Sequence, residues 1–306
     1  MSNKKVFFIV GATATGKSNL AINIALRVNG EIVNADSRLV YKNMDIGTSK
    51  PTPKQLSRIP HHLIDIKSPT EQYNLSEYLT TANKTISNIL KKGKVPIIVG
   101  GTGQYIWALY EGWKLDDTTP DYNLRESLSK LTLDDLCEKL EHHDPNSLFP
   151  VDRKNKRRII RAIEKAKHGS VGDKKSLPIW DPLIIGLHIE RSTLHKKIAT
   201  RTEQMMKMGF LDEVKTLLNL DLPSNAPVFT CIGYRELVAF INKEYDLNEA
   251  IRRTTISTNR LVRHQNNWFK QEDERIGWFN YSNNSIETQK NVMTKVWSFL
   301  KHETYN

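Results

Sequence analysis

The octapeptide GATATGKS, residues 11–18, constrains the fold more than any other segment of this chain. It matches G-x-x-x-x-G-K-[ST] at every fixed position, and it lies between the apolar run VFFIV at 6–10 and a helical pattern. Glycines let the backbone curl so that several amides converge on one anion, and the positive end of a helix dipole adds to that field. We therefore predict a phosphate-binding loop made of Gly11, Ala12, Thr13, Ala14, Thr15, Gly16, Lys17 and Ser18.

Such a loop binds a di- or triphosphate, with Lys17 supplying a full positive charge and the Ser18 hydroxyl placed to hold Mg²⁺. An ordinary NTPase also needs a carboxylate at the end of a later strand to complete the magnesium shell. The strand predicted at 95–99 ends in Gly-Gly-Thr instead, whereas the strand predicted at 31–35 ends in Asp36. Asp36 is therefore the candidate to accept a proton from a substrate or to orient the magnesium; the alternative is that it caps a helix.

Apolar runs of strand type alternate with helical patterns through much of the chain. The predicted strands cover 6–10, 31–35, 95–99 and 183–189, and the chain after 189 reads as helical, most clearly at 201–218 and 247–269. This alternation predicts an α/β fold, a P-loop NTPase-like parallel sheet flanked by helices. Between 116 and about 181 the strand-type runs disappear, so we expect an inserted all-helical domain at 116–182 within a discontinuous core of 1–115 plus 183–306.

The composition narrows the class of protein further. No stretch approaches the roughly 18 apolar residues of a membrane span, and no signal peptide is visible. Two cysteines 94 positions apart exclude a four-ligand zinc finger and a disulfide framework, so we expect a soluble cytoplasmic protein. The 45 Lys and Arg against 34 Asp and Glu give a net charge of +11, which favours an anionic partner.

Six segments follow one another in order over nearly the whole chain. They are GATATGKS (11–18), NADSRLVYKNMDIGTSKP (34–51), PHHLIDI (60–66), PIIVGGTGQYIWAL (96–109), NKRRIIRAIE (155–164) and CIGYRE (231–236). This set resembles the tRNA dimethylallyltransferases, also called tRNA isopentenyltransferases. The second segment is the most specific. Ala12 stands where the family usually has proline, and Gln104 stands where leucine is usual.

The resemblance implies a reaction in which a dimethylallyl group moves from dimethylallyl diphosphate to the N6 amine of the adenosine 3′ of a tRNA anticodon. The P-loop and Mg²⁺ would then hold a diphosphate leaving group rather than ATP, and Asp36 would be the general base. Thr102 would contact the target nucleotide, and Arg125 would contact RNA. Arg235 matches a basic family position near the diphosphate. Ser37, Arg38 and Leu39 follow Asp36 in the most specific segment and are expected to contact tRNA.

Two basic runs predict how the anticodon stem-loop is bound while the target adenosine is flipped into a pocket. Residues 153–168 hold eight Lys or Arg and one acid, and residues 250–271 hold five and none. Arg157, Arg158 and Arg161 are the predicted phosphate contacts; the alternative is that each run is an ordinary solvated helix face. Near the C-terminus the family usually reads TRxxAKRQxTWF, and TNRLVRHQNNWF (258–269) departs from it at Asn259 and His264.

Two other functions compete with the RNA prenyl transferase. The first is a P-loop kinase of a small-molecule acceptor, which the R-x-x-x-H-x-x-I-x-x-R run from Arg191 to Arg201 also fits. The second is a non-catalytic RNA-binding module. The doublet His61-His62 does not predict a metal pair, because adjacent side chains on a strand point to opposite faces. Trp107 and Trp113 are expected in the core, and the protein is expected to be a monomer.

Overall fold

The computed structural model describes residues 4–115, 121–143, 152–167, 174–175, 180–223, 225–282 and 286–301. The chain divides into two compact units, one made of 1–111 with 178–306 and the other of 112–177. The sequence placed this division at 116 and 182. Among the described residues no helix is both long enough and apolar enough to cross a bilayer.

The first unit is built on a six-stranded sheet in the order β3-β2-β4-β1-β7-β8, with every neighbouring pair parallel. The strands are β1 (Lys5–Gly11), β2 (Gly30–Asn34), β3 (His61–His62), β4 (Val95–Val99), β7 (Asp181–His188) and β8 (Ile276–Asn280). The predicted α/β class with a parallel sheet is confirmed. The expectation that the chain is helical after 189 is wrong at β8, whose five residues give too short a pattern to distinguish it from a loop.

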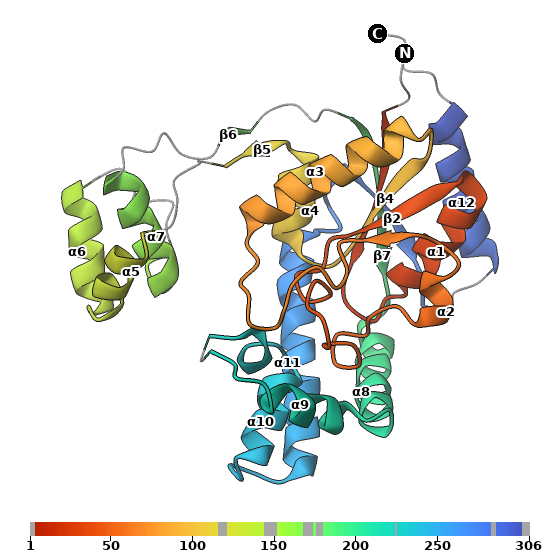
Figure 1. Ribbon diagram of the computed structural model, residues 1–306. Helices are drawn as coiled ribbons and strands as arrows, with labels where there is room; N and C mark the ends of the chain where they lie inside the picture. Colours follow the sequence, from red (N-terminus) through yellow and green to blue (C-terminus); the bar gives the residue numbers. More distant parts are fainter. Residues whose placement is uncertain are drawn as a thin grey trace. The chain divides into compact units, whose positions relative to one another are not determined.

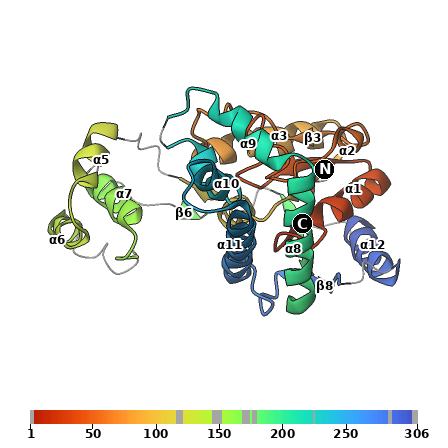
Figure 2. The same cartoon turned by 90° about the horizontal axis from the view of Figure 1, so that it is seen from below.

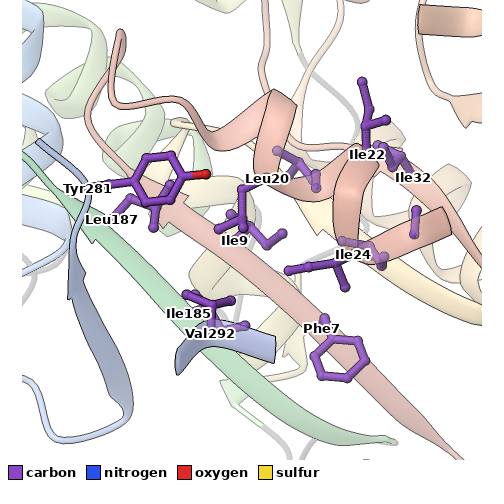
Figure 3. Packing of buried hydrophobic residues seen from close by; sticks show 14 of the residues in the cluster. Phe7, Ile9, Leu20, Ile22, Ile24, Ile32, Ile185, Leu187, Tyr281 and Val292 are labelled. Atoms are coloured by element: carbon purple, nitrogen blue, oxygen red, sulfur yellow. The ribbon is translucent and has the colours of Figure 1, made fainter. Parts of the chain in front are cut away.

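The sheet is buried because the side chains of its strands alternate between two helical layers. Figure 3 shows the packing on the face that carries Phe7 and Ile9. On β1, Phe7 points to one face and meets Phe299 with ring centroids 5.5 Å apart. Phe8 points to the other face and meets Tyr110 at 6.0 Å. Burial on both faces explains why the strand reads as an unbroken apolar run in the sequence.

Helices of the first unit cover both faces of the sheet (Figure 1). Helices α1 (Lys17–Val28) and α12 (Ile286–Lys301) pack on the Phe7 face, and α3 (Leu75–Lys91) and α4 (Gly103–Tyr110) pack on the other. The short α2 (Pro53–Leu56) lies in the long connection between β2 and α3.

A helical group follows β7 along the chain (Figures 1 and 2). It comprises α8 (Arg191–Lys207), α9 (Phe210–Leu218), the 3₁₀ turn η1 (Pro227–Phe229), α10 (Tyr234–Ile241) and α11 (Leu247–Trp268). The predicted single segment at 201–218 is two helices, because Gly209 adopts a φ of 96° and ends the first. Helix α11 packs against α8, α10 and α4, and so reaches the sheet.

The second unit contains α5 (Tyr122–Ser129), α6 (Leu133–His143) and α7 (Lys156–Lys167) around a small apolar core. Leu128, Leu136, Leu140, Ile159 and Ile163 form its buried centre. The two-residue strands β5 (Trp113–Lys114) and β6 (Lys174–Lys175) pair antiparallel, an element that the expectation of an all-helical insertion lacked. Trp107 of the first unit is buried as expected, whereas Trp113 is half-buried.

Candidate active site at the carboxyl edge of the sheet

The predicted phosphate loop connects β1 to α1. Gly16 has a φ of 96°, which a residue with a Cβ adopts only at a cost, and α1 begins immediately after it. The Thr15 hydroxyl donates to the Ala12 carbonyl at 2.9 Å, and the Lys17 ammonium folds back to donate to the same carbonyl at 2.6 Å. The loop is thus held closed with the N-terminal end of α1 beside it, which is an arrangement that binds anions.

A cavity of about 410 Å³ opens beside this loop. Its wall combines the phosphate loop with the ends of β2 and β4, the segment 48–51 and one side of α8. The polar and loop residues that line it include Thr13, Gly16, Lys17, Ser18, Asn34, Asp36, Ser49, Gly100, Gly101, Lys197, Arg201 and Gln204. Five of the predicted phosphate-loop positions, and also Asp36 and Leu39, therefore share one pocket with residues far away in the sequence.

Arg201 of α8 is the most informative of these distant residues. Its Nη1 donates to the Thr13 hydroxyl at 3.1 Å, and its Nε donates to the Ser49 hydroxyl at 2.9 Å. Burial lowers the pKa of Lys17 from 10.5 to about 8; the Asp36 carboxylate opposes that shift and the Arg201 guanidinium adds to it. Two cationic side chains thus lie beside one anion-binding loop, which suits a diphosphate.

Asp36 stands directly beyond the end of β2. Its backbone N–H donates to the Asn34 side chain at 2.8 Å, and the Asn34 amide donates to the Asp36 carbonyl at 2.9 Å. The Asp36 carboxylate accepts a hydrogen bond from the Arg38 N–H at 2.9 Å. No helix begins between Asp36 and α2 at Pro53, a stretch that the structure describes throughout, so the alternative of a helix cap is excluded. The carboxylate instead lines the cavity.

Thr102 lies next to Asp36 because β2 and β4 are neighbours in the sheet, with Asn34 opposite Val99. The Thr102 hydroxyl accepts from the Ser37 N–H at 3.1 Å and makes no cap bond to α4, although Thr102 occupies the N-cap position. The predicted nucleotide contacts Asp36, Ser37 and Thr102 are therefore brought together at one edge of the sheet.

Arg235 lies outside the residues that line the cavity. Its Nε donates to the Glu236 carboxylate at 2.8 Å, and its Nη2 donates to the Ser257 hydroxyl at 3.0 Å. The assignment of Arg235 to the diphosphate stays a prediction, whereas Arg201, which the sequence placed only within a kinase-like run, lines the pocket. That periodic run from Arg191 to Arg201 was the one signal that pointed to it.

The four predicted RNA contacts of the second unit have different environments. Arg125 and Arg161 both donate to the fully buried Glu164 carboxylate, and about a third of each side chain stays exposed. Arg158 is 63% exposed and lies 3.7 Å from Asp152, and Arg157 is exposed. All four keep surface for an RNA phosphate, and their contacts with RNA stay predictions.

The segment NMDIGTSK (43–50) is held in place by side chains whose role was not predicted from the sequence. The Glu213 carboxylate of α9 accepts from the N–H groups of Asp45, Ile46 and Gly47 at 2.9, 2.7 and 3.2 Å. Lys50, with 5% of its side chain exposed, pairs with Asp45 and Asp65. These bonds hold the wall that presents Ser49 to Arg201. The sequence did not point to Glu213, because its partners, three backbone N–H groups and the Tyr234 hydroxyl, are distant from it in the chain.

Among the described residues, no group of three or more His, Cys, Asp or Glu side chains is placed so that it could hold a metal ion by itself. Ser18 lines the pocket beside Lys17, so a hydroxyl is available there. His61 lines the cavity while His62 lies 2.7 Å from Glu31, which confirms that the doublet points to opposite faces.

Known proteins resemble the chain over almost its full length. A curated tRNA dimethylallyltransferase of Anoxybacillus flavithermus is 37% identical over 289 residues, which cover 92% of each chain. One from Leuconostoc mesenteroides is 36% identical over 97% of this chain and 99% of its own. The crystal structure of the full-length tRNA isopentenylpyrophosphate transferase of Bacillus halodurans is 31% identical, with a TM-score of 0.73 over 98% of this chain and 100% of its own.

A second solved structure, a eukaryotic dimethylallyltransferase acting on tRNA, shares the fold with a TM-score of 0.85 at 24% identity and covers 99% of this chain and 81% of its own. The family model described as IPP transferase matches residues 39–272. The predicted family and the P-loop NTPase-like fold are thereby confirmed. The chain belongs to the IPP transferase family.

Proposed function

We propose that this protein transfers the dimethylallyl group of dimethylallyl diphosphate to the N6 amine of the adenosine 3′ of the anticodon in tRNA. The products are N6-(dimethylallyl)adenosine and diphosphate. The observation that carries the proposal is one cavity that is lined by Lys17 and Arg201 beside a phosphate loop and by Asp36, whose neighbour Ser37 bonds to Thr102 at the next strand end.

The cavity suits both parts of the donor. Its cationic end, with Lys17, Arg201 and the N-terminus of α1, fits a diphosphate. Its wall also includes Ile32, Ile64 and Val99, apolar side chains that fit a five-carbon chain. An apolar wall beside a cationic end is therefore what the prenyl donor requires of this pocket.

The chemistry follows from the two ends of the pocket. The N6 amine is a poor nucleophile because its lone pair is delocalised into the adenine ring. It attacks C1 of the donor, the new C–N bond forms as the C–O bond breaks, and the electron pair leaves with the diphosphate. Asp36 takes the proton that N6 loses, and Lys17 and Arg201 stabilise the charge that grows on the leaving group.

Magnesium fits this site as a partner of the diphosphate. The Ser18 hydroxyl lines the pocket, and hydroxyl and diphosphate oxygens are the hard ligands that Mg²⁺ prefers. The bound ion would neutralise part of the diphosphate charge.

The anticodon stem-loop is the proposed partner of the basic surfaces. Arg157 and Arg158 on α7 and Arg260 and Arg263 on α11 are exposed, and phosphate contacts of this kind supply affinity without reading sequence. The target adenosine leaves its stack to reach Asp36. The protein is expected to act as a monomer in the cytoplasm.

The deciding experiment incubates unmodified tRNA with the protein, dimethylallyl diphosphate and Mg²⁺, and then analyses tRNA nucleosides by mass spectrometry. The expected result is one adenosine per tRNA, next to the anticodon, heavier by one prenyl unit, with a matching release of diphosphate. A parallel arm supplies ATP and no prenyl donor. ATP turnover with a small acceptor, and no prenylated adenosine, would favour the P-loop kinase and contradict the proposal.

A further inference from the structure

Gln265 of α11 connects the two loops that border the cavity. Its Oε1 accepts from the Thr13 N–H of the phosphate loop at 2.8 Å, and its Nε2 donates to the Gly101 carbonyl at 3.1 Å. The residue is only 5% exposed. One side-chain amide therefore bonds to the loop after β1 and, at the same time, to the loop after β4.

The two loops need such a connection because the sheet ends just before them. Strands β1 and β4 pair from Phe7 to Ile9, and the last backbone bond between them is a long one from the Gly100 N–H to the Ile9 carbonyl, at 3.4 Å. Thr13 and Gly101 lie beyond that point. Gln265 hydrogen-bonds to both Thr13 and Gly101, at a point where backbone hydrogen bonds no longer join β1 to β4.

The end of α11 that carries Gln265 is itself firmly placed. The Trp107 indole of α4 donates to the Trp268 carbonyl at 2.9 Å. A Cβ at Gly103 would lie 2.2 Å from Trp268, and a Cβ at Gly101 would lie 2.2 Å from the Gln265 amide nitrogen. Glycine at both positions thus lets α11 approach the strand end closely, so the amide is held at one position.

We propose that Gln265 is a positioning residue that sets the spacing between the diphosphate and the target adenosine. This inference rests on the proposed function, in which the phosphate loop holds the leaving group and the Gly100–Thr102 loop adjoins the nucleotide. Transfer requires N6 and C1 to approach in line, and a misplacement of about 1 Å can cost roughly 10²-fold in rate. A glutamine suits the task because it offers one acceptor and one donor on a short rigid group.

Two variants test the spacing. Gln265→Met keeps the length of the side chain and loses both hydrogen bonds; Gln265→Glu keeps the acceptor for Thr13 but sets a carboxylate against the Gly101 carbonyl. We expect the single-turnover transfer rate to fall by about 10- to 100-fold in each. In Gln265→Met the dissociation constants for dimethylallyl diphosphate and for tRNA, measured separately, should stay within about threefold of the parent.

Asn291→Asp is the matched control, because it changes an exposed amide of α12 to a carboxylate away from the cavity, and it should transfer at the parental rate. A purely structural role would lower the folded fraction but not the rate per folded molecule. A parental single-turnover rate in folded Gln265→Met overturns the inference, as does a loss matched by an equal loss of affinity for both substrates.

If Gln265→Met does not fold, the single-turnover rate per folded molecule of Gln265→Glu tests the inference instead. A parental rate in that variant overturns it. Failure of the parent protein to prenylate tRNA would instead contradict the proposed function.

Discussion

The Arg125 guanidinium donates two hydrogen bonds to the Glu164 carboxylate, from Nε to Oε1 at 3.1 Å and from Nη2 to Oε2 at 2.7 Å. Glu164 is fully buried and also accepts from the Asp121 N–H and from Arg161. Burial raises the pKa of this carboxyl, but the bonds from Arg125, Arg161 and the Asp121 amide outweigh it and hold the pKa below its ordinary value. Glu164 thereby joins α5 to α7.

Glu164→Gln should therefore destabilise the second unit. Removing one partner of a buried ion pair leaves the other charges uncompensated, and because both arginines are about one third exposed we expect a loss of about 2–4 kcal/mol rather than the full buried value. Hydrogen exchange of α5 and α7 measures it. The control is Glu138→Gln on the exposed side of α6. Equal hydrogen-exchange rates of α5 and α7 in the two variants would show that Glu164 does not stabilise the packing of these helices.

The same contacts refine which arginines bind RNA phosphates. Arg157→Ala with Arg158→Ala should weaken tRNA binding, because both side chains are exposed and Glu164 bonds instead to Arg125 and Arg161. The double variant should also reduce the slope of log affinity against log salt by about 1.5–2. Arg161→Ala should lower stability as well as affinity. The matched control is Lys290→Ala with Lys295→Ala, which removes two positive charges from α12 instead of α7. Filter binding from 50 to 300 mM salt compares them, and an unchanged slope in the α7 variant would identify that run as an ordinary solvated surface.

Asp36→Asn should lower the single-turnover chemical rate by about 10²- to 10⁴-fold. Asparagine keeps an oxygen that can accept from the Arg38 N–H, so the local backbone should stay in place, but it cannot take the proton of N6. Rapid-quench measurements with saturating tRNA separate this step from binding. A parental single-turnover rate together with a large loss of tRNA affinity would show that Asp36 binds RNA and is not the general base.

Local features of the sequence predicted the phosphate loop, the buried strands and Asp36 at a strand end, because each depends on residues adjacent in the chain. The strand order then brings Asp36 and Thr102 together. Arg201 reaches Thr13 across 188 positions, and Gln265 reaches it across 252. No periodicity predicts such contacts, since they depend on how α8 and α11 pack against the sheet.

Arg201→Gln and Arg235→Gln decide which arginine serves the diphosphate. Arg201 lines the pocket and Arg235 is bonded to Glu236 and Ser257, so the loss should be larger in the first variant. A charge-assisted hydrogen bond contributes about 1.5–3 kcal/mol, so the KM for dimethylallyl diphosphate should rise roughly 10- to 150-fold in Arg201→Gln, with little change in tRNA affinity. A larger rise in Arg235→Gln would reverse the assignment and support the prediction from the family resemblance.

Lys17 should make diphosphate binding depend on pH. Its pKa of about 8 in the folded protein lies below the ordinary 10.5, so the ammonium is present below pH 8 and is lost as the pH rises through that value. The charged form is the one that attracts the diphosphate, so affinity should be full below pH 8 and should fall up to about tenfold for each pH unit above it.

Calorimetric titration with dimethylallyl diphosphate between pH 6.5 and 9.5, without tRNA, measures this dependence. The last ionisation of the ligand falls near pH 6, as for a phosphate monoester, and so does not account for a change near 8. Lys17→Gln has no amine to titrate, and it should bind weakly with no inflection near pH 8. If that variant shows the same inflection as the parent, another group titrates there and Lys17 is not the source of the pH dependence.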